Sequence, residues 1–116
     1  MPDSASVRAR CVGTVAIVTI DGYLNNTGGE KIAEACEALI AEGSRRIVLN
    51  LENCSMANSV GISYLIDVLE QMRELEGQVA FCCLTPTLAK TFTIMGLLNE
   101  AHPYATEREA VQALDL

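Results

Sequence analysis

Buried-strand patterns alternate with amphipathic-helix patterns along this chain, and that alternation limits the available folds more than any other feature. Residues 14–20 read T-V-A-I-V-T-I, which is β-branched and apolar on both faces, as a central strand should be. A second buried strand, I-V-L-N-L, follows Arg46, and residues 78–84 form a third. A weaker edge strand is predicted around residues 6–11. Strands that are apolar on both faces predict a sheet covered on both sides.

Helical patterns separate these strands. Thr27–Glu30 is a capping box, which predicts a helix that ends at Gly43. A second apolar stripe predicts a helix that ends near Gly77, and Thr85–Pro86 marks the start of a third. Thr106–Glu109 is another capping box and opens a terminal helix. The residues expected to face inward are Ile32, Cys36, Leu39, Ile40, Ile62, Leu65, Ile66, Leu69, Met72, Leu88, Phe92, Met95, Val111 and Leu114.

The predicted order of elements is β-β-α-β-α-β-α, followed by one more short strand near Tyr104 and a last helix. Strands that alternate with helices imply parallel pairing with crossover connections, while an N-terminal hairpin makes the sheet mixed. We therefore predict an α/β fold with a mixed, mostly parallel sheet of four to five strands and about four helices. No linker or repeat is visible, so residues 1–116 are expected to form a single domain.

Composition and charge argue against several function classes. The formal net charge of −7 disfavours direct binding of nucleic acid or of anionic lipid. No apolar run is long enough to span a bilayer, and the polar first ten residues lack a signal-peptide core, so we expect a cytoplasmic protein. The odd number of cysteines and their spacing match no zinc pattern, which favours reduced, buried thiols and no metal or cofactor. These cysteines are Cys11, Cys36, Cys54, Cys82 and Cys83.

An enzyme is not indicated. His102, expected in a loop before Pro103, has no evident nucleophile partner. Gly28–Gly29 has neither the length nor the lysine of a phosphate-binding loop. Ser59 lacks the Gly-x-Ser-x-Gly setting of a hydrolase nucleophile. We assign no catalytic residue and predict a binding protein.

The most informative segment is Cys54–Ile62, where a buried strand gives way to a helix. Ser59 lies at or beside the helix cap, and no acidic residue follows it until Asp67. The unpaired N–H groups and aligned peptide dipoles of that helix start favour an anion, and Gly61 would let one approach. A phosphate on Ser59 would suit this position. Serine is also among the commonest N-caps, however, and Gly61 can serve close packing alone.

In the order and spacing of several short segments, the chain resembles a STAS domain over residues 12–114. Asp21–Asn25 is similar to the family's turn after the central strand, and Arg45–Leu51 is similar to its third strand. Met56–Ile62 is similar to the family's phosphorylation motif. Phe92–Leu97 resembles its short helix that ends in a Gly-Leu turn.

The resemblance implies a STAS, anti-sigma factor antagonist-like fold and a regulated binding module. In such antagonists, the unphosphorylated protein binds an anti-sigma factor with serine kinase activity and so frees a sigma factor. Phosphorylation of the motif serine breaks that complex, and a serine phosphatase restores it. The residue implied here is Ser59, framed by Asn58, Val60 and Gly61.

Two positions depart from the family's pattern. Asn58 and Asn25 stand where the family usually has aspartate. Both changes remove a negative charge near the proposed phosphate, which would lessen repulsion with a phosphoserine at position 59. The same changes are also compatible with an altered or lost contact to the kinase.

The partner surface is expected to extend from these residues to Ser63 and Asp67 on the next helix and to Tyr23 and Asn25 in the nearby turn. Tyr23 is either an exposed anchor for the partner or a turn-packing residue. Two alternatives to an antagonist stay open: a STAS scaffold subunit of a signalling or lipid-transport assembly, and a sensor of a small nucleotide or lipid ligand. The apolar content also leaves room for a homodimer.

Overall fold

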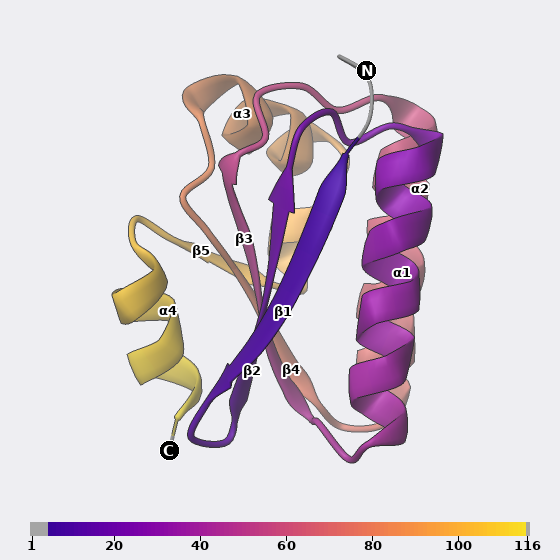
Figure 1. Ribbon diagram of the computed structural model, residues 1–116. Helices are drawn as coiled ribbons and strands as arrows, with labels where there is room; N and C mark the ends of the chain where they lie inside the picture. The colour runs from indigo at the N-terminus through magenta and orange to yellow at the C-terminus, as the bar shows by residue number, and fades with distance from the viewer. Residues whose placement is uncertain (1–4, 116) are drawn as a thin grey trace.

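The computed structural model describes residues 5–115 and contains a five-stranded sheet with the strand order β1-β2-β3-β4-β5 (Figure 1). The strands are β1 (Ser6–Val12), β2 (Val15–Asp21), β3 (Arg46–Asn53), β4 (Gln78–Cys82) and β5 (His102–Tyr104). The helices are α1 (Asn26–Ala41), α2 (Ser59–Glu74), α3 (Pro86–Ile94), α4 (Glu107–Leu114) and the short 3-10 helix η1 (Leu97–Asn99). β1 pairs antiparallel with β2, and the other neighbouring strands pair in parallel. The predicted mixed, mostly parallel sheet and its four α-helices are confirmed.

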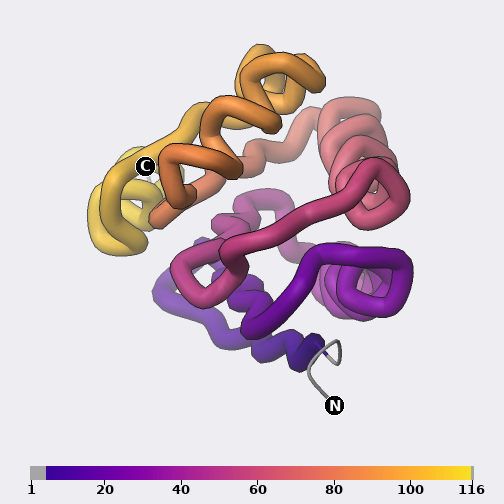
Figure 2. Tube along the Cα trace, turned by 90° about the horizontal axis from the view of Figure 1, so that it is seen from above, coloured from indigo at the N-terminus to yellow at the C-terminus, as the bar shows by residue number. Residues whose placement is uncertain are grey.

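The helices cover the two faces of the sheet unequally. α1 and α2 lie side by side on one face, and α4 covers the other (Figure 1). Figure 2, seen from above, shows α1 and α2 next to each other and α3 on the side of the molecule away from β1. Because β3 and β4 run parallel, the segments that lead into α2 and α3 both leave the sheet at the same end.

Side-chain alternation explains why β2 and β3 are continuous apolar runs. In β2, Val18 and Ile20 pack in the larger core beneath α1 and α2, whereas Val15 and Ile17 pack in the smaller core beneath α4. Val48 of β3 also belongs to the smaller core. Burying each such side chain contributes about 1.5–3 kcal/mol, so both faces of the central strands stabilise the fold.

The predicted cap of α1 was wrong: the helix starts before Thr27, which is exposed within its first turn. The N-cap is Asn25, whose Oδ1 accepts a hydrogen bond from the Gly28 N–H at 3.0 Å. Asparagine caps a helix as well as serine does. Gly28 makes the earlier start possible, because a Cβ there would lie 2.6 Å from the carbonyl oxygen of Tyr23.

Two further predictions on the C-terminal half were wrong. Met95 was expected to face inward but is 43% exposed. α3 ends at Ile94, and Gly96 then turns the chain with a φ of +81°, so Met95 lies past the last helical turn. His102 was expected in a loop but opens β5, where it pairs with Ala80.

The five cysteines are free, but not all are buried. Cys36, Cys54 and Cys82 are buried, as predicted. Burial raises the pKa of Cys36 to about 12, so its thiol stays protonated near neutral pH and packs as a small apolar group. The prediction was wrong for Cys11, which lies on the exposed edge strand β1, and for Cys83, which is half-buried.

Glu107, in the first turn of α4, joins that helix to the sheet through side-chain hydrogen bonds to β3 and β1. One carboxylate oxygen accepts a hydrogen bond from Nδ2 of Asn50 at 2.9 Å, and the other accepts one from Arg10. Asn50 is only 6% exposed, so losing Glu107 leaves a buried donor unpaired.

We therefore expect Glu107→Ala to lower the free energy of unfolding by about 2 kcal/mol in urea titrations. Arg108→Ala, an exposed position on the same helix, is the control and should change it by less than about 0.5 kcal/mol. Equal stability of the two variants would show that Glu107 does not hold α4 in place.

Candidate functional site

Two loops at the carboxyl ends of β2 and β3 lie against each other and form the candidate site. Leu24 and Ala57 form a parallel bridge between them. The Leu24 N–H donates to the Met56 carbonyl at 2.9 Å, and the Asn58 N–H donates to the Leu24 carbonyl at 3.0 Å. The turn after β2 therefore lies beside the segment that contains Ser59, as the sequence predicted.

Ser59 is the first residue of α2, next to the cap and not the cap itself. The cap is Asn58, whose Oδ1 accepts a hydrogen bond from the Gly61 N–H at 2.8 Å. α1 and α2 thus begin alike, each with an asparagine bonded to a glycine three residues later. Neither first turn contains an acidic residue, as predicted for α2. The peptide dipoles therefore leave both helix starts electropositive beside Ser59.

Of the two roles considered for Gly61, anion access to the backbone and close packing, the structure supports close packing. Gly61 is buried, and a Cβ there would lie 2.2 Å from the carbonyl oxygen of Leu24. The glycine instead lets the start of α2 pack against the loop after β2. Gly29 has a similar role between the helices, since its Cβ would lie 2.6 Å from Cδ2 of Tyr64. The Tyr64 hydroxyl donates to Oδ1 of Asn26 at 3.1 Å, which joins α2 to the start of α1.

The outer surface of the site combines a hydroxyl group with apolar side chains. Ser59 is exposed, and its neighbours Met56 and Val60 are 57% and 48% exposed. Ser63 lies on the next turn, exposed, and its Oγ donates to the Val60 carbonyl at 2.5 Å. Asp67 is exposed further along α2. Sequence reasoning did not include Met56 among the partner-binding residues, although it opens the segment Met56–Ile62 that resembles the phosphorylation motif.

Tyr23 and Asn25 complete the loop pair, and both are half-buried. The Tyr23 carbonyl accepts a hydrogen bond from the Asn25 N–H at 3.0 Å, so the main chain of Tyr23 shapes the turn. Within residues 5–115, no three His, Cys, Asp or Glu side chains are grouped so that they could hold a metal ion. In the same range, no helix has the length and apolar character needed to cross a membrane.

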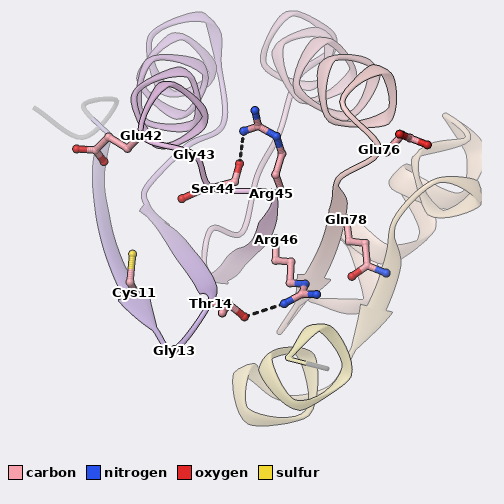
Figure 3. A pocket seen from close by; sticks show the side chains of 10 residues that line it. All are labelled: Cys11, Gly13, Thr14, Glu42, Gly43, Ser44, Arg45, Arg46, Glu76 and Gln78. Atoms are coloured by element: carbon pink, nitrogen blue, oxygen red, sulfur yellow. Dashed lines mark hydrogen bonds between the residues drawn. The ribbon is translucent and has the colours of Figure 1, made fainter.

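A surface pocket of about 680 Å³ lies at the opposite end of the sheet, where the turn between β1 and β2 meets the loops before β3 and β4. Figure 3 shows Arg45 pointing toward the helices and Arg46 pointing toward Thr14, so their guanidinium groups diverge. Arg45 donates to the Ser44 carbonyl and Arg46 donates to Oγ1 of Thr14, each at 2.9 Å. These arginines stabilise the turns and do not converge on one ligand.

The cap at Asn58 can be tested separately from function. Asn58→Ala removes the acceptor for the Gly61 N–H and should lower the free energy of unfolding by about 1 kcal/mol. Asn58→Asp keeps the acceptor and adds a negative charge at the helix start, so stability should stay equal or rise by up to about 1 kcal/mol. Urea unfolding of both variants measures these changes in the free energy of unfolding. An equal loss in the two variants would mean that Asn58 does more than cap the helix.

Comparison with known proteins gives four relevant findings. The sequence model of the STAS domain matches residues 6–110. A protein of Bordetella bronchiseptica named "Putative anti-sigma factor antagonist BtrV" is 31% identical over 97 residues, which is 84% of this chain and 83% of that protein. An anti-sigma factor antagonist from Mycobacterium paratuberculosis superposes with a TM-score of 0.88 at 21% identity, covering 100% of this chain and 98% of that one. The phosphorylated form of the Bacillus cell fate determinant SpoIIAA superposes with a TM-score of 0.75 at 23% identity, covering 93% and 98%.

Proposed function

This chain belongs to the STAS domain family, and we propose that it is an anti-sigma factor antagonist switched by phosphorylation of Ser59. In its unphosphorylated form it binds an anti-sigma factor that is also a serine kinase, and a sigma factor is thereby freed. Phosphorylation of Ser59 by that kinase breaks the complex, and a serine phosphatase restores it. The chain acts in the cytoplasm, by binding and not by catalysis.

The observation that supports this proposal best is the exposure of Ser59 between two exposed apolar side chains, Met56 and Val60. A kinase needs a hydroxyl group that its active site can reach, and Ser59 is exposed at the start of α2. A stable partner needs apolar surface to bury, and the two neighbours offer it. The hydrogen bonds between the loops at Leu24 and Asn58 hold this surface in place, which lowers the entropy lost on binding.

A phosphate on Ser59 would act on the partner more than on the fold. It would add about −1.5 to −2 charges beside Met56 and Val60. A partner that buries these apolar side chains would have to desolvate that charge, which opposes binding. The caps Asn58 and Asn25 are uncharged, so the phosphate meets less repulsion within the chain than it would beside two aspartates. The phosphorylated chain is therefore expected to stay folded.

Retention of proteins from extracts of the native cell on the immobilised chain tests this proposal. We expect the wild-type chain to retain an anti-sigma factor with a serine kinase domain. We also expect the retained kinase to phosphorylate the wild type but not Ser59→Ala. Retention of subunits of a lipid-transport or scaffolding assembly, without such a kinase, would contradict the proposal and support the alternative.

A further inference from the structure

Two neighbouring cysteines at the end of β4 place their thiols on the same side of the sheet. In a regular strand, consecutive side chains point to opposite faces. Cys82 is the last residue of β4, and Cys83 follows it with a left-handed φ of +65°. This backbone conformation breaks the alternation, so Cys82 lies in the small core beneath α4 and Cys83 packs against the same core.

Both side chains pack in or against the same small core, and one of them can be reached from solvent. Cys82 is fully buried, whereas Cys83 is half-buried. A left-handed conformation costs a residue other than glycine about 1–2 kcal/mol, so the turn alone does not explain a thiol at position 83. The N–H of Cys83 donates to the Tyr104 carbonyl at 3.0 Å, which ties the turn to β5.

We infer that Cys82 and Cys83 form an oxidation site that closes to a disulfide between neighbouring residues when a two-electron oxidant such as hydrogen peroxide reaches Cys83. The Cys83 thiolate attacks one peroxide oxygen, and the O–O bond breaks to give a sulfenic acid on Cys83 and hydroxide. The Cys82 sulfur then attacks the Cys83 sulfur, the S–O bond breaks, and the hydroxyl group leaves as water with the Cys82 proton. In sum, two thiols and one peroxide give one disulfide and two waters. A thiol reductant reverses the closure.

The surroundings of the pair fix the order of these steps. Burial raises the pKa of the Cys82 thiol, and the neighbouring Cys83 and the nearby carboxylates of Glu107 and Glu52 raise it further. The Cys82 thiol therefore stays protonated near neutral pH. Cys83 is the more exposed of the two and is therefore the thiol that the oxidant reaches first.

The test uses the full chain with Cys11→Ser, because Cys11 is an exposed competing thiol. The protein is treated with hydrogen peroxide, its remaining thiols are alkylated, and it is digested with trypsin. Cleavage after Arg73 and Lys90 isolates residues 74–90, a peptide that contains both cysteines and no methionine. We expect this peptide to lose two hydrogen atoms, to resist alkylation, and to regain both thiols with dithiothreitol.

Cys82→Ser and Cys83→Ser, made in the same background, are the matched variants. Neither should lose two hydrogen atoms, and Cys82→Ser should carry sulfenic acid or its further oxidised forms on Cys83 instead. Oxygen addition to Cys83 in the parent protein without closure would overturn the inference. So would closure only between two chains, or two thiols that still react fully with the alkylating agent. Far-UV circular dichroism of each variant shows that the fold is intact, and none of these readouts depends on Ser59 or on a partner.

Discussion

Gly61→Ala should lower the free energy of unfolding by about 3 kcal/mol and the melting temperature by roughly 10 °C. The added Cβ would lie 2.2 Å from the carbonyl oxygen of Leu24 and 3.0 Å from the Asn25 nitrogen. Both neighbours are backbone atoms, and that same carbonyl accepts the Asn58 N–H, so no side chain can move aside. The start of α2 would have to separate from the loop after β2.

Val60→Ala is the matched control for this variant. Val60 lies one residue earlier in the same turn but is 48% exposed, so its truncation should change the free energy of unfolding by less than about 0.5 kcal/mol. Thermal and urea unfolding of the two variants provide the comparison. A Gly61→Ala protein as stable as the wild type would mean that the two loops are not packed as described.

Ser59→Asp should weaken binding of the anti-sigma partner about 100-fold, which corresponds to about 2.7 kcal/mol. The substitution puts a carboxylate between the exposed apolar side chains of Met56 and Val60, where a partner would have to desolvate it. Ser59→Ala adds no charge and should bind as the wild type does, but it should no longer respond to the kinase. Titration calorimetry with the retained partner measures all three affinities.

Ser44→Asp is the control for added charge. Ser44 lies before β3, at the opposite end of the sheet from Ser59, so a carboxylate there should leave the partner's affinity unchanged. If the wild type, Ser59→Ala and Ser59→Asp all bind equally, Ser59 is not the switch. Equal weakening by Ser44→Asp and Ser59→Asp would instead show a general effect of net charge.

The strands and the helix faces could be predicted because they depend on local patterns. β2 (Val15–Asp21) and β3 (Arg46–Asn53) carry buried apolar side chains on both of their faces. This pattern indicates strands in the middle of a sheet that is covered on both sides. The stripe that includes Ile62 and Leu65 has the spacing of a helix with one buried face, and both residues are buried. The position of Ser59 at the start of α2 followed from the same reasoning.

Contacts between distant segments could not be predicted in this way. The role of Gly61 depends on the Leu24 carbonyl, and nothing in the local sequence indicates that the two loops approach so closely. The cap of α1 is Asn25 and not the predicted Thr27 for the same reason, because Gly28 packs on the turn before the helix. The exposure of Met95 depended on where α3 ends.

The central claim is that Ser59 is the phosphorylated residue, and peptide mass spectrometry of the protein isolated from its native cell tests this most directly. Isolation under phosphatase inhibition preserves any phosphate. Our account predicts a phosphate localised to Ser59, with Ser55 and Ser63 unmodified. Complete coverage of that segment without phosphate under every growth condition would contradict the account. It would identify the chain as a STAS domain that binds constitutively, with Asn58 and Asn25 as traces of a lost switch.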